Sequence, residues 1–298
     1  MDTHTQAQFQ TYVDQQEALG FSAKVLSRER AELTHFWRWA AAHHHLTITP
    51  AVAAAYQTHL ADAGLAPSTV RYKLARLKRF YRWRQHRRLA PDNPFGALTM
   101  PQHHPHYQRQ GLSESEITRL MATPDLTTIN GVRVRAILET FYSTGLREME
   151  LARLTLYDLD HAQGWVRVDQ GKHRKDRMVP IGRTALYWLL RYLDEGRPEI
   201  ARDPDTGHLF LSGQGHPYRR QGALSCLVRR YFVKAGIAKP GACHLLRHSA
   251  ATHMLNHGAD IRHIQAFLGH RSLRTTQGYT HLSTSDLRQA QQNHHPWA

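Results

Sequence analysis

The chain has 298 residues, a formal net charge of +15 and a sequence pI of about 10.2. Its length allows two domains, and a hydrophobic content of 41% is that of a folded globular protein. No apolar run approaches the roughly 18 residues of a membrane-spanning helix, and no signal-peptide apolar region follows Met1. The two cysteines, Cys226 and Cys243, have no metal-binding spacing and predict a cytoplasmic protein. The positive surplus indicates a polyanionic partner such as nucleic acid.

Histidine is abundant, with 23 residues, but its pattern predicts no metal site and no cofactor. The run His43-His44-His45 has no cysteine or carboxylate cluster to complete a site, so we expect a surface run. His244 and His248 have the spacing of zinc-protease ligands, but Leu245 stands where such helices carry the general-base glutamate.

Residues 1–90 are predicted to form a helical DNA-binding domain, with helices at 24–44, 49–63 and 67–88. Thr49 and Pro50 have the pattern of an N-cap followed by a first-turn proline. The segment 67–88 carries apolar residues on one face and nine Lys or Arg residues elsewhere, with no acid. Surface helices normally mix charges for pairing, so this excess predicts contact with a phosphate backbone. The expected DNA-binding residues are Arg71, Lys73, Lys78, Arg79 and Arg82.

Residues 91–111 contain four prolines and no helical period, which predicts a linker. A second domain, 112–282, begins with the capping-box spacing of Ser113 and Glu116. It is predicted to be mostly α, with a β-hairpin within 164–181 and a short strand at 208–211. The predicted helices are at 114–122, 131–143, 147–154, 183–195 and 218–235, and 242–297 is helical with breaks. The predicted fold class is therefore mainly α with a small antiparallel sheet, and 283–298 form a tail.

The second domain carries residues suited to metal-free chemistry on a phosphodiester. In-line attack builds negative charge on the non-bridging oxygens, and arginine binds such oxygens with two parallel hydrogen bonds. Arg147 and Arg247 are the candidates, with His270 as a further donor. Tyr279 is the candidate nucleophile, and Lys172 on the hairpin turn is the candidate general acid.

Two further residues have expected supporting roles. His244, one helical turn before Arg247, is the candidate for proton exchange with the tyrosine. Glu150, three residues after Arg147, is the candidate acid that holds a guanidinium in place. Arg174 and Lys175, beside the predicted general acid, are expected to contact DNA.

The order of these residues resembles the tyrosine recombinases of the phage-integrase superfamily, and most closely the Xer type. The similar motifs are TGLREMEL at 144–151, GKHRKDRMVP at 171–180, HLLRHSAATHML at 244–255 and LGHRSLRTTQGYTH at 268–281. The first domain resembles a core-binding domain through FYRW at 80–83 and NPF at 93–95, and the tail NHHPWA resembles the His-Pro tail of Xer proteins. The chain departs from the family at His173, where a glycine is usual, and at Ala250, where a phenylalanine is common.

The resemblance implies a site-specific recombinase that cuts DNA through a covalent 3′-phosphotyrosine and rejoins it through a four-way junction. It implies a two-domain clamp around double-stranded DNA with an inverted-repeat site. The active complex would be a tetramer on two sites, formed by this chain alone or with a second recombinase. Residues 283–298 would pack on a neighbouring protomer. Two alternatives stay open: a type IB topoisomerase-like enzyme, and a DNA-binding accessory protein without catalysis.

Overall fold

The computed structural model describes residues 3–101, 111–169, 176–269, 288, 291–293 and 295–297. It divides into two compact units, Met1–Arg109 and Gln110–Ala298. Within the described ranges, no helix combines the length and the apolar composition that crossing a membrane would require.

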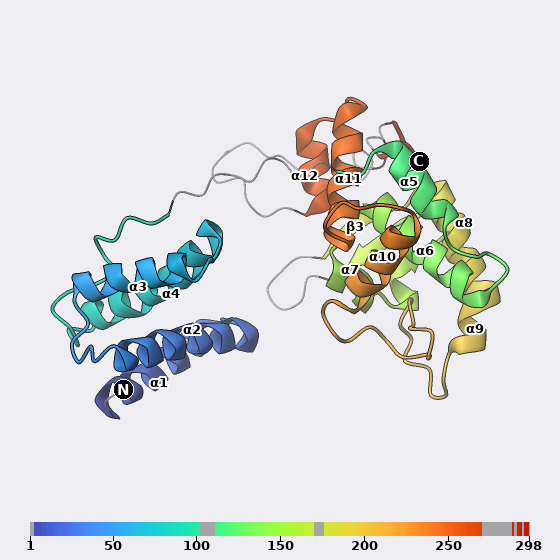
Figure 1. Cartoon of the computed structure of the whole chain (residues 1–298). Helices are drawn as coiled ribbons and strands as arrows, with labels where there is room; N and C mark the ends of the chain where they lie inside the picture. The colour runs from blue at the N-terminus through green and yellow to red at the C-terminus, as the bar shows by residue number, and fades with distance from the viewer. Residues whose placement is uncertain are drawn as a thin grey trace. The chain divides into compact units, whose positions relative to one another are not determined.

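The first unit is a bundle of helices (Figure 1). Its core is rich in aromatic residues. Its helices are α1 (Thr3–Ala18), α2 (Ala23–Ala42), α3 (Pro50–Asp62) and α4 (Pro67–His86). The predicted cap of α3 is present, because the Thr49 side chain accepts a hydrogen bond from Val52 N at 3.3 Å. Phe95, which lies in the predicted linker, is fully buried in this core. Asn93 fixes that segment by donating to the Lys78 carbonyl oxygen at 3.1 Å.

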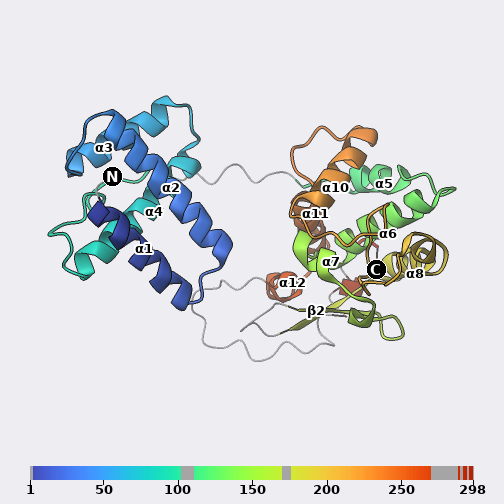
Figure 2. The same ribbon diagram turned by 90° about the horizontal axis from the view of Figure 1, so that it is seen from below.

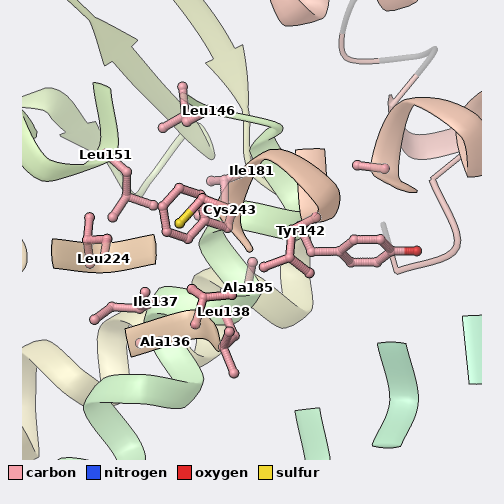
Figure 3. Packing of buried hydrophobic residues seen from close by; sticks show 14 of the residues in the cluster. Ala136, Ile137, Leu138, Tyr142, Leu146, Leu151, Ile181, Ala185, Leu224 and Cys243 are labelled. Carbon is pink, nitrogen blue, oxygen red and sulfur yellow. The ribbon is translucent and has the colours of Figure 1, made fainter. Parts of the chain in front are cut away.

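The second unit is built around α6, which is buried along almost its whole length. Its buried charged residues are partnered: Arg133 donates to Leu211 O and Asn130 Oδ1, and Glu139 accepts from Arg135. Helices α8 and α11 pack against α6 (Figures 1 and 2). Figure 3 shows Tyr142 of α6, Leu151 of α7 and Cys243 of α11 among the side chains of this core. The helices are α5 (Glu114–Ala122), α6 (Ile129–Thr144), α7 (Glu148–Arg153), α8 (Arg183–Arg191), α9 (Arg197–Ile200), α10 (Ala223–Lys234), α11 (Cys243–Asn256) and α12 (Ile261–Leu268), with a 3₁₀ turn η1 (Leu156–Asp158) and a π turn η2 (Tyr192–Gly196).

A small antiparallel sheet lies beside this helical core, in the order β1-β2-β3. Its strands are β1 (Leu159–Asp160), β2 (Trp165–Val168) and β3 (Arg177–Pro180). Strands β2 and β3 pair with Val168 opposite Arg177, which confirms the predicted hairpin strands. The mainly α class with a small antiparallel sheet is also confirmed.

Two predicted elements of this unit were wrong in detail. The predicted strand at 208–211 forms only isolated bridges, between Thr155 and His208 and between Leu211 and Pro217. The predicted helix at 218–235 begins only at Ala223, because Gly222, at φ +92°, interrupts a helical path before it. The predicted capping box of α5 is present, with reciprocal hydrogen bonds between Ser113 and Glu116.

Candidate active site

Arg147 lies at the N-cap of α7, directly after the turn that ends α6. Gly145 makes this turn in the left-handed conformation, at φ +57°, which favours glycine. The Arg147 backbone N–H donates to Glu150 Oε2 at 2.9 Å, and its Nη1 donates to Glu150 Oε1 at 2.6 Å. Its Nη2 donates to the Gly269 carbonyl oxygen at 3.0 Å. The carboxylate and one carbonyl thus fix the orientation of a guanidinium whose side chain is 39% exposed.

Arg247 of α11 reaches the same place from a position 100 residues further along the chain. It is 5% exposed, and it donates to the carbonyl oxygens of Gly145 at 2.5 Å and Leu268 at 2.7 Å. Burial, together with the nearby positive charge of Arg147, lowers the pKa of Arg247 to about 10. The group therefore stays charged at neutral pH, and it joins the C-terminal ends of α6 and α12.

A third arginine, Arg177, joins Arg147, Arg247 and Glu150 in one arginine cluster, and it was not predicted. It donates to both oxygens of Glu150, from Nη1 at 3.1 Å and from Nη2 at 2.8 Å. Burial by itself would raise the pKa of Glu150, but the hydrogen bonds from Arg177 and from the Arg147 backbone lower it to about 2. One sequence signal was available: Arg177 shares a strand face with the buried Val179, and a charge on a buried face needs a partner.

Of the remaining predicted catalytic residues, the structure describes His244. His244 is the second residue of α11 and its side chain is exposed, whereas Arg247 on the next turn is buried. Lys172, His270 and Tyr279 lie outside the described residues. The predicted DNA-contacting residues Arg174 and Lys175 also lie outside them. In the described part of the chain, no group of three or more His, Cys, Asp or Glu side chains could hold a metal ion.

The basic face of α4 is partly paired with acids, although residues 67–88 themselves contain none. Helix α2 supplies two acids that the spacing within α4 could not reveal. Lys73 contacts Glu32 at 2.5 Å, and Arg79 contacts the fully buried Glu29 at 3.1 Å. Among the described residues, the other three expected DNA-binding residues form no ion pair with a carboxylate. Arg71 donates to the Pro101 carbonyl oxygen at 3.5 Å and Lys78 donates to the Gly96 carbonyl oxygen at 2.6 Å. Arg82 is exposed.

The described tail residues contact their own catalytic unit. His295 is 5% exposed and its Nε2 donates to the Tyr142 carbonyl oxygen at 3.0 Å. The Tyr142 ring makes edge-type contacts with the rings of His295 and Trp297, at centroid distances of 4.6 and 5.1 Å. Gly182 is required beside the tail, because a Cβ there would lie 2.7 Å from the Trp297 carbonyl oxygen.

The matched family model, described as the phage integrase family, covers residues 110–286, and this range includes every residue of the arginine cluster. The chain belongs to this family. It is 40% identical to the tyrosine recombinase XerC 2 of Ralstonia nicotianae over 93% of this chain and 82% of that protein. It is 36% identical to the tyrosine recombinase XerD of Proteus mirabilis, over 93% of this chain and 88% of the relative.

The fold is that of solved integrases. A structure of the Tn1549 transposon integrase in complex with a circular intermediate DNA has a TM-score of 0.72 and 18% identity, and covers 96% of this chain and 98% of the other. The chain is therefore an Xer-like tyrosine recombinase, an enzyme of site-specific DNA recombination.

Proposed function

We propose that Arg147 and Arg247 bind the scissile phosphate of DNA, with His270 as a further donor. The convergence of the two arginines supports this most directly. Arg147 donates to the Gly269 carbonyl oxygen, and Arg247 donates to the adjacent Leu268 carbonyl oxygen and to that of Gly145, so both guanidinium groups are fixed at the C-terminal end of α12. Two fixed guanidinium groups stabilise the charge of a five-coordinate transition state without rearranging during the reaction.

In the proposed reaction, the Tyr279 oxygen attacks phosphorus and the deoxyribose 5′-oxygen leaves. Lys172 gives a proton to that 5′-oxygen, and His244 exchanges a proton with the tyrosine. The products are a 3′-phosphotyrosine and a free 5′-hydroxyl. Attack by a 5′-hydroxyl on the phosphotyrosine reverses the step, so rejoining needs no ATP.

A nicked suicide substrate tests this assignment, because loss of a short fragment traps the covalent adduct. We expect wild-type protein to form a phosphotyrosyl adduct and Tyr279→Phe to form none at equal DNA occupancy. An adduct formed by Tyr279→Phe would exclude Tyr279 as the nucleophile. The same preparation on one-site and two-site plasmids distinguishes a recombinase, which needs two sites, from a topoisomerase-like enzyme, which relaxes a plasmid with one.

We also propose that the first unit and the catalytic unit clamp double-stranded DNA, with α4 facing the duplex. Arg71, Lys78 and Arg82 are the main contributors to phosphate binding, since Lys73 and Arg79 are already paired with acids of α2. Each neutralised phosphate contributes about −0.9 to the slope of log K against log salt.

A salt titration of DNA binding tests this face. Replacing Arg71, Lys78 and Arg82 by alanine should make the slope shallower by up to about three such increments. Arg28→Ala, an exposed position on α2, is the control and should leave the slope unchanged. An unchanged slope in the triple variant would remove α4 from the DNA interface.

The proposed assembly is a tetramer on two inverted-repeat sites, formed by this chain alone or with a second recombinase. Residues 283–298 would pack on a neighbouring protomer, which requires their release from the surface around Tyr142. A chain ending at residue 282 is expected to bind single sites and to fail to join two. Normal two-site complexes of the shortened chain in native gels would contradict this.

The proposed compartment is the cytoplasm, with the protein bound to the nucleoid.

A further inference from the structure

Arg177 connects three parts of the candidate site. It begins β3, its side chain is 12% exposed, and both of its terminal nitrogens donate to Glu150 of α7. It also lies against Gly269: a Cβ added there would be 2.8 Å from Arg177 Nε. The carbonyl oxygen of Gly269 in turn accepts from Arg147. Thus β3, which follows the predicted lysine turn, contacts both groups that hold the Arg147 side chain, Glu150 and Gly269.

Glu150 is the shared acceptor of this arrangement. It receives four hydrogen bonds, two from Arg147 and two from Arg177. Bidentate pairing with a guanidinium is the most directional way to fix a carboxylate. With both oxygens held from the β3 side, Glu150 can orient Arg147 in one direction only.

The charges in the cluster give Arg177 a second role. A carboxylate that orients Arg147 also cancels part of the positive charge that a phosphate would experience. Three guanidinium groups, of Arg147, Arg177 and Arg247, against one carboxylate leave a net charge of +2. Without Arg177 the net charge would be +1, while the transition state of phosphodiester cleavage gains negative charge.

We propose that Arg177 is a positioning residue for DNA strand cleavage: it fixes Glu150 and offsets its negative charge, so that Glu150 orients Arg147 without lowering the net positive charge that the phosphate meets. The proposal rests on the assignment of Arg147 to the scissile phosphate. It concerns a residue that does not touch the reacting atoms and acts through Glu150.

Single-turnover cleavage of a suicide substrate at saturating protein tests the proposal. Arg177→Met should slow adduct formation by about 10- to 100-fold, the effect of a coupling between contacting residues, with little change in DNA affinity. Arg177→Lys should be intermediate, because it keeps the charge and loses the two-point contact. The matched control is Arg167→Met on the adjacent strand, where an arginine pairs with Asp158 at 3.1 Å outside the cluster, and it should cleave normally.

A double-mutant cycle with Glu150→Gln separates this role from a merely structural one. If Arg177 offsets the Glu150 charge, Arg177→Met with Glu150→Gln should cleave several-fold faster than Arg177→Met alone. Thermal unfolding of each variant reports folding separately. The proposal would be overturned if Arg177→Met cleaved at the wild-type rate, or if the rate losses of the two single variants multiplied in the double variant. Absence of an adduct with wild-type protein would instead reject the proposed function itself.

Discussion

Replacing Arg247 by methionine separates the chemical role of this guanidinium from its contribution to folding. A pKa lowered from 12.5 to about 10 means that the buried site disfavours the charged form by roughly 3 kcal/mol. Against this, the two hydrogen bonds to Gly145 and Leu268 contribute about 1.5–3 kcal/mol each, because the donor is charged. The two effects nearly offset each other, so Arg247→Met should lower the free energy of unfolding by only about 0–3 kcal/mol.

Cleavage should respond much more strongly than stability. Loss of one preorganised donor to a transition-state oxygen typically costs about 10²–10³ in rate. Urea unfolding and single-turnover cleavage of the same preparation measure the two effects. Arg133→Met is the matched control, because Arg133 is 4% exposed, donates to Leu211 and Asn130, and lies outside the cluster. It should lose stability while the folded fraction cleaves normally. Cleavage by Arg247→Met within about threefold of wild type would refute the reasoning, since the rate term would then be far below that of a transition-state donor.

Gly145→Ala should lower the free energy of unfolding by more than the roughly 1–2 kcal/mol of left-handed strain, because its Cβ would lie 2.9 Å from Leu268 Cδ2. Gly236→Ala carries the same strain at φ +68° with no atom within 4 Å, so equal losses in urea unfolding would show that the contact is relieved freely. Burial lowers the pKa of His295 from 6.5 to about 4, so its contribution to tail docking is greatest above pH 6.5, and docking weakens toward pH 4 by up to about tenfold per pH unit. Protease sensitivity of the tail should rise over that range in wild type but not in His295→Gln, and a pH-independent wild type would contradict the assignment.

Local pattern was enough to predict most of the elements. The caps at Thr49 and Ser113 are made by neighbours within a few residues. The apolar spacing of α4 and the two strands of the hairpin were likewise visible as short-range sequence patterns. The predicted strand at 208–211 was wrong because a short apolar run is equally suited to a buried loop. The late start of α10 depends on a glycine at φ +92°, which composition does not reveal.

The order of motifs identified the enzyme class, because phosphodiester chemistry without a metal needs arginines, a proton donor and a nucleophile of particular types. The types and the order of these residues can be read directly from the sequence. The pairing of charges is not local. Only folding brings Glu29 of α2 to Arg79 of α4, and Arg177 to Glu150. An ion pair between distant elements depends on how their faces meet, and no spacing along the chain encodes it.

The sequence by itself therefore determined the two-unit helical organisation, the recombinase chemistry and the candidate residues, since each depends on residue type and short-range spacing. The tertiary structure decided which cations are partnered and which stay available. It showed that one carboxylate holds two arginines and that backbone carbonyls hold Arg247. It also showed the described tail residues on their own unit. Apart from the local Arg147–Glu150 pair on α7, these contacts join segments more than 20 residues apart, so they depend on how the elements pack and not on spacing along the chain.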